Sequence, residues 1–268
     1  MAELENNLPV AEEPAVLVEK RGKIQIITLN RPKAGNTVNG DLAQGLDAAL
    51  NAAEEDDDIF AVILTGAGSK IFCAGADVKY MAQYGPAGMK IPGHGFGGLV
   101  ERYFSKPLIC AVNGAAMGGG LEMALACDLI VAAENAKFAL PEVKLGILAA
   151  GGGPIRIMRS VHKAIALEML LTGEAVKAQR ALEIGLINQV VPAEELMDAA
   201  ITLAERVTAN APIAVRGTKE LAYKSVEMDI PEAFELSNVI RDKIRESEDS
   251  KEGSLAFREK RAPVWKNR

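Results

Sequence analysis

A chain of 268 residues, 49% of them hydrophobic and 25% charged, has the composition of a globular protein and enough length for a well-filled core. Its formal net charge of −6 argues against a nucleic-acid-binding protein, because such proteins usually carry a basic surplus. No apolar run reaches the roughly 18 residues that suggest a membrane-spanning helix, so we expect no membrane partner.

The N-terminal residues and the cysteines indicate the cellular compartment. Residues 1–14 contain four glutamates and no lysine or arginine, whereas targeting peptides are basic. We therefore expect a flexible acidic leader and a cytoplasmic protein. The cysteines form no CxxC pair and have apolar neighbours, which predicts buried, reduced thiols at Cys73, Cys110 and Cys127.

Residues 15–200 show short apolar runs that alternate with helical patterns, which is typical of an α/β core. The first two runs flank Arg21-Gly22-Lys23 and predict a hairpin. The expected strands are Val16–Glu19, Ile24–Leu29, Phe60–Leu64, Leu108–Val112 and Asp128–Ala132, and the expected helices are Asp41–Ala53 and Leu121–Cys127.

Two regions depart from this alternation. Residues 85–98 contain six glycines, two prolines and His94, so we expect no regular element there but a mobile loop over a site. From about Lys163 onward, strand signals nearly vanish. Pro and Gly separate helical patterns over His162–Leu171, Lys177–Ile184, Ala193–Asn210, Pro212–Met228 and Pro231–Glu246. Such helices must bury their apolar faces, so residues 201–268 are predicted to form an oligomerisation region of a homotrimer or homohexamer.

Several common kinds of site are excluded. With only two histidines, His94 and His162, a multi-histidine metal site is impossible, and no GxSxG nucleophile elbow is present. The glycines after Thr65 fail the dinucleotide fingerprint at Ile71, and those after Gly114 lack the lysine of a P-loop. We expect neither a metal nor a separate cofactor.

Three segments could carry chemistry. In Ile71–Asp77, small residues would allow a ligand close to the backbone, and Asp77 would cap a helix over Val78–Tyr84; a plain turn is the alternative. In Val112–Glu122, a glycine triplet precedes a helix whose free N–H groups could bind an anion. In Phe138–Gly146, Pro141 suits the start of a short helix that carries Glu142.

Glu122 and Glu142 have a simple alternative role as exposed acids at helix starts. Their apolar neighbours weigh against that role and favour carboxylates in a site. Two sets of N–H donors could hold an oxyanion, and two such carboxylates could act as acid and base. Together they indicate enolate chemistry on a thioester.

The order and spacing of these motifs resemble the enoyl-CoA hydratase/isomerase (crotonase) superfamily over about residues 15–265. The resemblance implies a spiral α/β core of repeated β-β-α turns and a C-terminal helical trimerisation region. The matching segments are Asn30-Arg31-Pro32, Phe72–Asp77, Asn113–Glu122, Pro141–Gly146, Leu171–Glu174, Gly185-Leu186, Val191-Pro192 and Phe257–Arg261.

The resemblance also implies roles for individual residues. The amides of Ala76 and Gly119 would form the oxyanion hole, and Glu122 and Glu142 would be the catalytic acids of a hydro-lyase in fatty acid metabolism such as β-oxidation. Coenzyme A is then part of the substrate, contacted by Arg31, Lys33, Thr37, Ala74, Asp77, Phe257 and Lys260, the last two commonly reaching the CoA of a neighbouring subunit. The acyl pocket would include Met81, Met117, Leu148 and Ala149.

Alternatives within and outside the superfamily stay open. The segment Ile147–Pro154 departs from the usual Thr-Ile-Pro-Gly run, and Asn36–Asn39 departs from the usual Asn-Ala-Leu-Asn. Family isomerases often keep only the second acid, so the presence of both favours an enoyl-CoA hydratase. The rivals are a double-bond isomerase, a dedicated catabolic acyl-CoA dehydratase and a non-catalytic binding protein.

Overall fold

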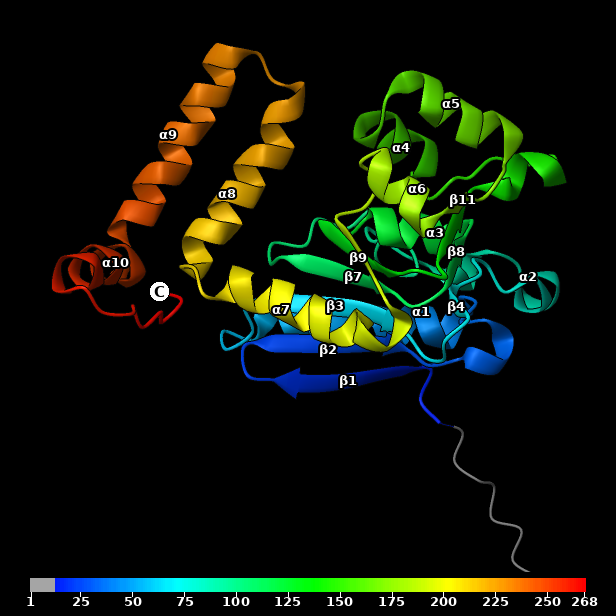
Figure 1. The fold of residues 1–268 in the computed structure, drawn as a ribbon, viewed down its shortest axis with the longest axis horizontal. Coiled ribbons are helices and arrows are strands. Elements are labelled where there is room, and N and C mark those ends of the chain that lie inside the picture. Colours follow the sequence, from blue (N-terminus) through cyan, green and yellow to red (C-terminus); the bar gives the residue numbers. More distant parts are fainter. Residues whose placement is uncertain (1–12) are drawn as a thin grey trace, which may run out of the picture.

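The chain folds around two sheets whose strands alternate along the sequence (Figure 1). A computed structural model describes residues 13–268. The six-stranded sheet has the order β1 (Val16–Arg21), β2 (Ile24–Leu29), β3 (Ala61–Gly66), β7 (Leu108–Val112), β9 (Leu129–Ala133), β12 (Gln189–Val191). The four-stranded sheet has the order β11 (Val176–Lys177), β10 (Lys137–Ala139), β8 (Ala115–Met117), β4 (Ile71–Cys73).

Successive turns of the chain give one strand to each sheet and then a helix. The units are β3-β4-α2, β7-β8-α3 and β9-β10-α4, so the strands follow the same order in both sheets. Within each sheet these strands are parallel, and only the edge strands β1 and β11 pair antiparallel. The helices are α2 (Val78–Tyr84), α3 (Gly119–Leu125) and α4 (Gly153–Ser160). This is the repeated β-β-α arrangement expected above.

The six-stranded sheet is covered on both faces, which explains its continuous apolar runs. On β2, Ile26 faces the cluster that includes α7 (Leu196–Thr208), whereas Ile27 faces the main core with α1 (Gly40–Glu55). Every residue of β3 is buried. The strands thereby place their carboxyl ends, and the loops that follow them, in fixed positions.

The last helices stand apart from the two sheets. In Figure 1, α8 (Pro212–Lys224) and α9 (Ile230–Glu246) project side by side from the core, followed by α10 (Glu248–Glu259). The expected boundary between residues 200 and 201 falls inside α7, where Ala200 and Ala204 both pack on the six-stranded sheet. A cavity of about 800 Å³ separates α8 from α4.

Several local predictions are confirmed, including the first hairpin, the helices α1 and α3, and the buried free thiols. The short strands β4, β8, β10, β11 and β12 were missed, because two or three residues give no readable period; the longer helix α10 was also missed. Other connecting elements are α5 (Lys163–Thr172), α6 (Ala178–Glu183), and the 3-10 turns η1 (Pro32–Ala34), η4 (Ala193–Glu195) and η5 (Ser225–Glu227). The expected leader lies mostly outside the described residues, and across residues 13–268 no helix is both long and apolar enough to cross a membrane.

The expectation of an irregular loop over residues 85–98 was wrong. This segment contains η2 (Ala87–Met89) and a hairpin of β5 (Lys90–Ile91) and β6 (Gly95–Phe96), with Met89 and Phe96 buried. Its glycines at positive φ form the tight turns that let so short a hairpin dock on the core. His94 fastens it to α1, with Nδ1 at 2.5 Å from Asp47 Oδ1.

Candidate active site

The glycine triplet Gly118-Gly119-Gly120, where β8 leads into α3, forms a turn that only small residues allow. Gly118 has φ of 55°, and a Cβ built on it would meet Glu142 Oε1 at 2.7 Å. Gly119 begins α3, and its N–H donates to no other described residue. A free N–H at a helix start carries positive partial charge, so it can receive an anionic oxygen.

A second free N–H comes from the segment after β4. The Val38 N–H donates to the Gly75 carbonyl at 2.8 Å, and the Asp77 N–H donates to the Val38 carbonyl at 2.9 Å. Between these two bonds the Ala76 N–H has no acceptor among residues 13–268. Gly75 packs against the triplet, since a Cβ built on it would lie 3.2 Å from the Gly119 nitrogen. The two free donors therefore lie in touching segments.

Glu122 lies in the first turn of α3 and is only 4% exposed. The Gly153 N–H, at the start of α4, donates to its Oε1 at 2.9 Å. Burial raises the pKa of the Glu122 carboxyl, and the amides of Gly153 and Gly151 and the charges of Arg156 and Lys90 oppose that rise. The site thus supplies several groups that stabilise an ionised Glu122.

Glu142 lies on η3 (Pro141–Leu145), with Pro141 at its start as the sequence predicted. Its Oε2 is buried and has no hydrogen-bond partner in the described chain. Burial raises the pKa of this carboxyl, a hydrogen bond from its own backbone N–H opposes that rise, and the charge of Glu122 raises the pKa further. An ionised Glu122 therefore favours the protonated form of Glu142.

The hairpin β5–β6 closes one side of this site. A Cβ built on Gly119 would meet Phe96 Cε1 at 2.5 Å, so the ring of Phe96 lies against the glycine that carries a free N–H. Gly97 packs in the same way near the Met123 sulfur of α3. The sequence analysis did not select Phe96, and the glycines around it were the only signal that this segment approaches other backbone.

Comparisons with known proteins identify the family. The profile described as enoyl-CoA hydratase/isomerase matches residues 19–268. A short-chain-enoyl-CoA hydratase of Clostridium acetobutylicum is 40% identical over 252 residues, covering 92% of this chain and 95% of that protein. A carnitinyl-CoA dehydratase of Proteus mirabilis is 42% identical over 253 residues, covering 92% and 97%.

A solved structure extends the match to three dimensions. The crystal structure of enoyl-CoA hydratase from Mycobacterium tuberculosis H37Rv has a TM-score of 0.91 and 45% identity, covering 94% of this chain and 99% of that one. The chain belongs to the enoyl-CoA hydratase/isomerase family. The crotonase-type α/β fold that the sequence predicted for a member of this family is therefore confirmed.

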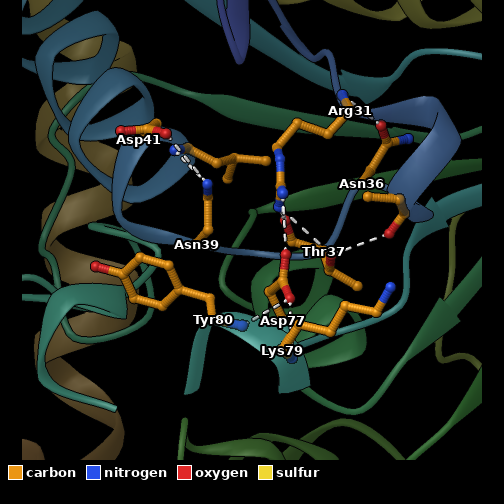
Figure 2. A network of polar contacts seen from close by, with 10 residues as sticks. Arg31, Asn36, Thr37, Asn39, Asp41, Asp77, Lys79 and Tyr80 are labelled. Carbon is orange, nitrogen blue, oxygen red and sulfur yellow. Dashed lines mark hydrogen bonds and ion pairs between the residues drawn. The ribbon is translucent and has the colours of Figure 1, made fainter. Parts of the chain in front are cut away.

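The residues that this family membership suggested for CoA lie in two places. Arg31 and Asp77 bind each other at 2.9 Å, and Arg31 also donates to the carbonyl of Thr37 (Figure 2). Lys33 and Ala74 are exposed beside them. Phe257 and Lys260 instead lie at α10, which Figure 1 shows on the opposite side of the molecule from α2.

The residues expected in the acyl pocket differ in exposure. Met117 directly precedes the glycine triplet, and Ala149 is buried in the main core. Met81, on α2, and Leu148 are exposed, Leu148 by 71%. Within residues 13–268, no cluster of three or more His, Cys, Asp or Glu side chains has the arrangement of a metal site.

Proposed function

We propose that this protein catalyses the reversible syn addition of water to a 2-enoyl-CoA thioester. The observation that carries the proposal is a pair of acids, the buried Glu122 and the half-buried Glu142 with its buried Oε2, beside two free backbone N–H groups. The Ala76 and Gly119 N–H groups bind the thioester oxygen. Negative charge gathers on that oxygen as the enolate forms, so fixed donors stabilise the transition state more than the substrate.

The two acids divide the proton transfers according to their surroundings. Glu122, whose ionised form is stabilised by the Gly153 N–H and by nearby cations, takes a proton from water as the water oxygen adds to the β-carbon. Glu142, which keeps its proton, donates it to the α-carbon of the enolate. The reverse sequence removes water.

The groups around Glu122 and Gly119 surround the acyl end of the proposed site. Lys90 and Arg156 are the cations that act on Glu122, and Phe96 lies against Gly119. The CoA part lies along residues 31–37, where Lys33 and Thr37 are available, with Ala74 close by. Met117 and Ala149 form the inner acyl pocket, and Met81 and Leu148 form its outer edge.

The helical region completes the site in an assembly of three or six copies. Phe257 is 88% exposed, and Ile230 and Phe234 on α9 are exposed by 70% and 67%, which are apolar surfaces that a second copy would cover. Because α10 lies opposite α2, its Phe257 and Lys260 contact the CoA bound to a neighbouring subunit.

The test measures hydration and proton exchange in the same variants. Hydration is followed by the loss of conjugated absorbance across a panel of enoyl-CoA thioesters. Glu122→Gln should abolish hydration but retain slow deuterium uptake at the α-carbon of a saturated acyl-CoA in heavy water. Glu142→Gln should suppress both, because each proton-transfer role contributes roughly 10²–10⁴ in rate.

A matched variant controls for changes in net charge. Glu183→Gln alters an exposed glutamate that pairs with Arg180, so both rates should match the wild type. If Glu142→Gln exchanged the α-proton at the wild-type rate, the two roles would have to be swapped or shared. A wild type that moves the double bond of a 3-enoyl-CoA faster than it hydrates would instead support the isomerase alternative.

A further inference from the structure

The loop after β2 clamps the segment that carries the Ala76 N–H. Three backbone bonds join the two segments, because the Ala74 N–H donates to the Gly35 carbonyl at 3.0 Å in addition to the two bonds made by Val38. These bonds fix the positions on either side of Ala76. They also hold the peptide plane that carries the Ala76 N–H, because that N–H shares its plane with the Gly75 carbonyl. The direction of the Ala76 N–H therefore depends on how the loop around Val38 is held.

Asp77 is held by side-chain contacts on both of its oxygens. Its Oδ1 accepts from the backbone N–H groups of Lys79 and Tyr80, each at 3.1 Å, and so caps α2. Its Oδ2 binds Arg31 Nη2 at 2.9 Å, while Nη1 of the same guanidinium donates to the Thr37 carbonyl at 2.5 Å (Figure 2). The guanidinium therefore joins Asp77 to the clamping loop.

The pair also controls charge beside the oxyanion site. Asp77 directly follows Ala76 in the chain, so an unpaired carboxylate there would oppose negative charge on the thioester oxygen. The side chains of Arg31 and Asp77 are only 22% and 14% exposed, so solvent screens them less than it screens a surface pair. The Arg31 guanidinium already binds Asp77 and the Thr37 carbonyl, so it has less freedom to bind a CoA phosphate.

We propose that Arg31 is a positioning residue that aims the Ala76 N–H and neutralises Asp77, and that it does not serve chiefly as a CoA contact. The inference rests on the proposed function for the role of the Ala76 N–H. It assigns Arg31 an effect on the chemical step, whereas a CoA contact would act on substrate binding.

The experiment separates turnover from binding. Arg31→Gln should lower kcat by about tenfold to 10²-fold, the range expected for a slightly misplaced catalytic group, with KM changed less than about threefold. Binding of 3-phenylpropenoyl-CoA gives a second readout, because donors that polarise its carbonyl shift its absorbance to the red. Arg31→Gln should reduce this shift, and Arg31→Lys should restore part of it.

A double variant tests whether Arg31 acts through Asp77. Asn caps helices as well as Asp does, so Asp77→Asn keeps the cap while removing the charge. The double variant Arg31→Gln/Asp77→Asn should turn over no more slowly than Arg31→Gln alone, since the two residues act as one unit. Arg180→Gln, which breaks an exposed pair away from these segments, should leave kcat and the red shift unchanged.

Two results would overturn the inference. One is a raised KM with unchanged kcat and red shift in Arg31→Gln, which would identify a CoA contact. The other is a double variant whose loss of kcat equals the product of the two single losses. A wild type without hydratase activity would contradict the proposed function, whereas either of these two results would contradict this inference alone.

Discussion

A proline at position 119 would remove a single N–H group from the proposed oxyanion site and still permit α3 to form. Gly119 is the first residue of α3, the position that proline favours, and its φ is outside the left-handed region. Any side chain there has a steric cost, because a Cβ would meet Phe96 Cε1 at 2.5 Å and Cζ at 2.8 Å. The loss of the Gly119 N–H and the steric clash with Phe96 must therefore be measured separately.

Two double variants make that separation. In Gly119→Pro/Phe96→Ala and Gly119→Ala/Phe96→Ala the ring is gone, and the variants differ mainly in whether residue 119 has an N–H. Loss of one oxyanion donor costs about 2.7–4 kcal/mol in the transition state, which is roughly 10²–10³ in kcat. We expect kcat of the proline variant to be lower than that of the alanine variant by this factor. KM should differ little, because the donor acts mainly on the enolate.

The assay is the loss of conjugated absorbance of a short 2-enoyl-CoA, with circular dichroism to confirm that both variants are folded. The single variant Gly119→Ala measures the steric effect by itself, which we expect to cost about 1–3 kcal/mol of stability from overpacking. Equal kcat values in the two double variants would show that the Gly119 N–H is not an oxyanion donor.

Burial raises the pKa of the Glu142 carboxyl above its usual 4.5, so the folded protein holds the proton of Glu142 more tightly than the unfolded chain does. The free energy of unfolding therefore falls as pH rises through the raised pKa. Glu142→Gln should therefore increase the free energy of unfolding in urea at about pH 8 and have little effect at about pH 4; a decrease at the higher pH would contradict this sign. His94→Ala should retain most of the hydratase activity, because His94 binds Asp47 and neither proposed proton transfer uses it; a loss as large as that of Glu142→Gln would show that the assignment is incomplete. Light scattering at micromolar concentration should give the mass of a trimer or hexamer, and a stable monomer would also remove the role given to Lys260.

The sequence alone determined the features that depend on neighbouring residues. The apolar runs of β2, β3 and β7 and the turn at Gly22 were readable because pairing and burial repeat along a short stretch. The cap at Asp77 and the start of η3 at Pro141 were readable because they depend on one or two positions. The spacing of the glycine triplet and the two glutamates also indicated the family, since motif order survives without knowledge of contacts.

Which groups of the proposed site face each other depends on the tertiary structure. Arg31 and Asp77 are 46 positions apart, and Glu122 and the Gly153 N–H are 31 apart, so no local pattern joins them. The glycine-rich composition of residues 85–98 predicted an irregular loop, but the structure has a docked hairpin that brings Phe96 against Gly119. The contacts of this hairpin with α1 and α3 outweigh the flexibility of its glycines. The pKa shifts of the two acids depend on the fold in the same way, since burial and the groups around each carboxyl come from distant segments that only folding brings together.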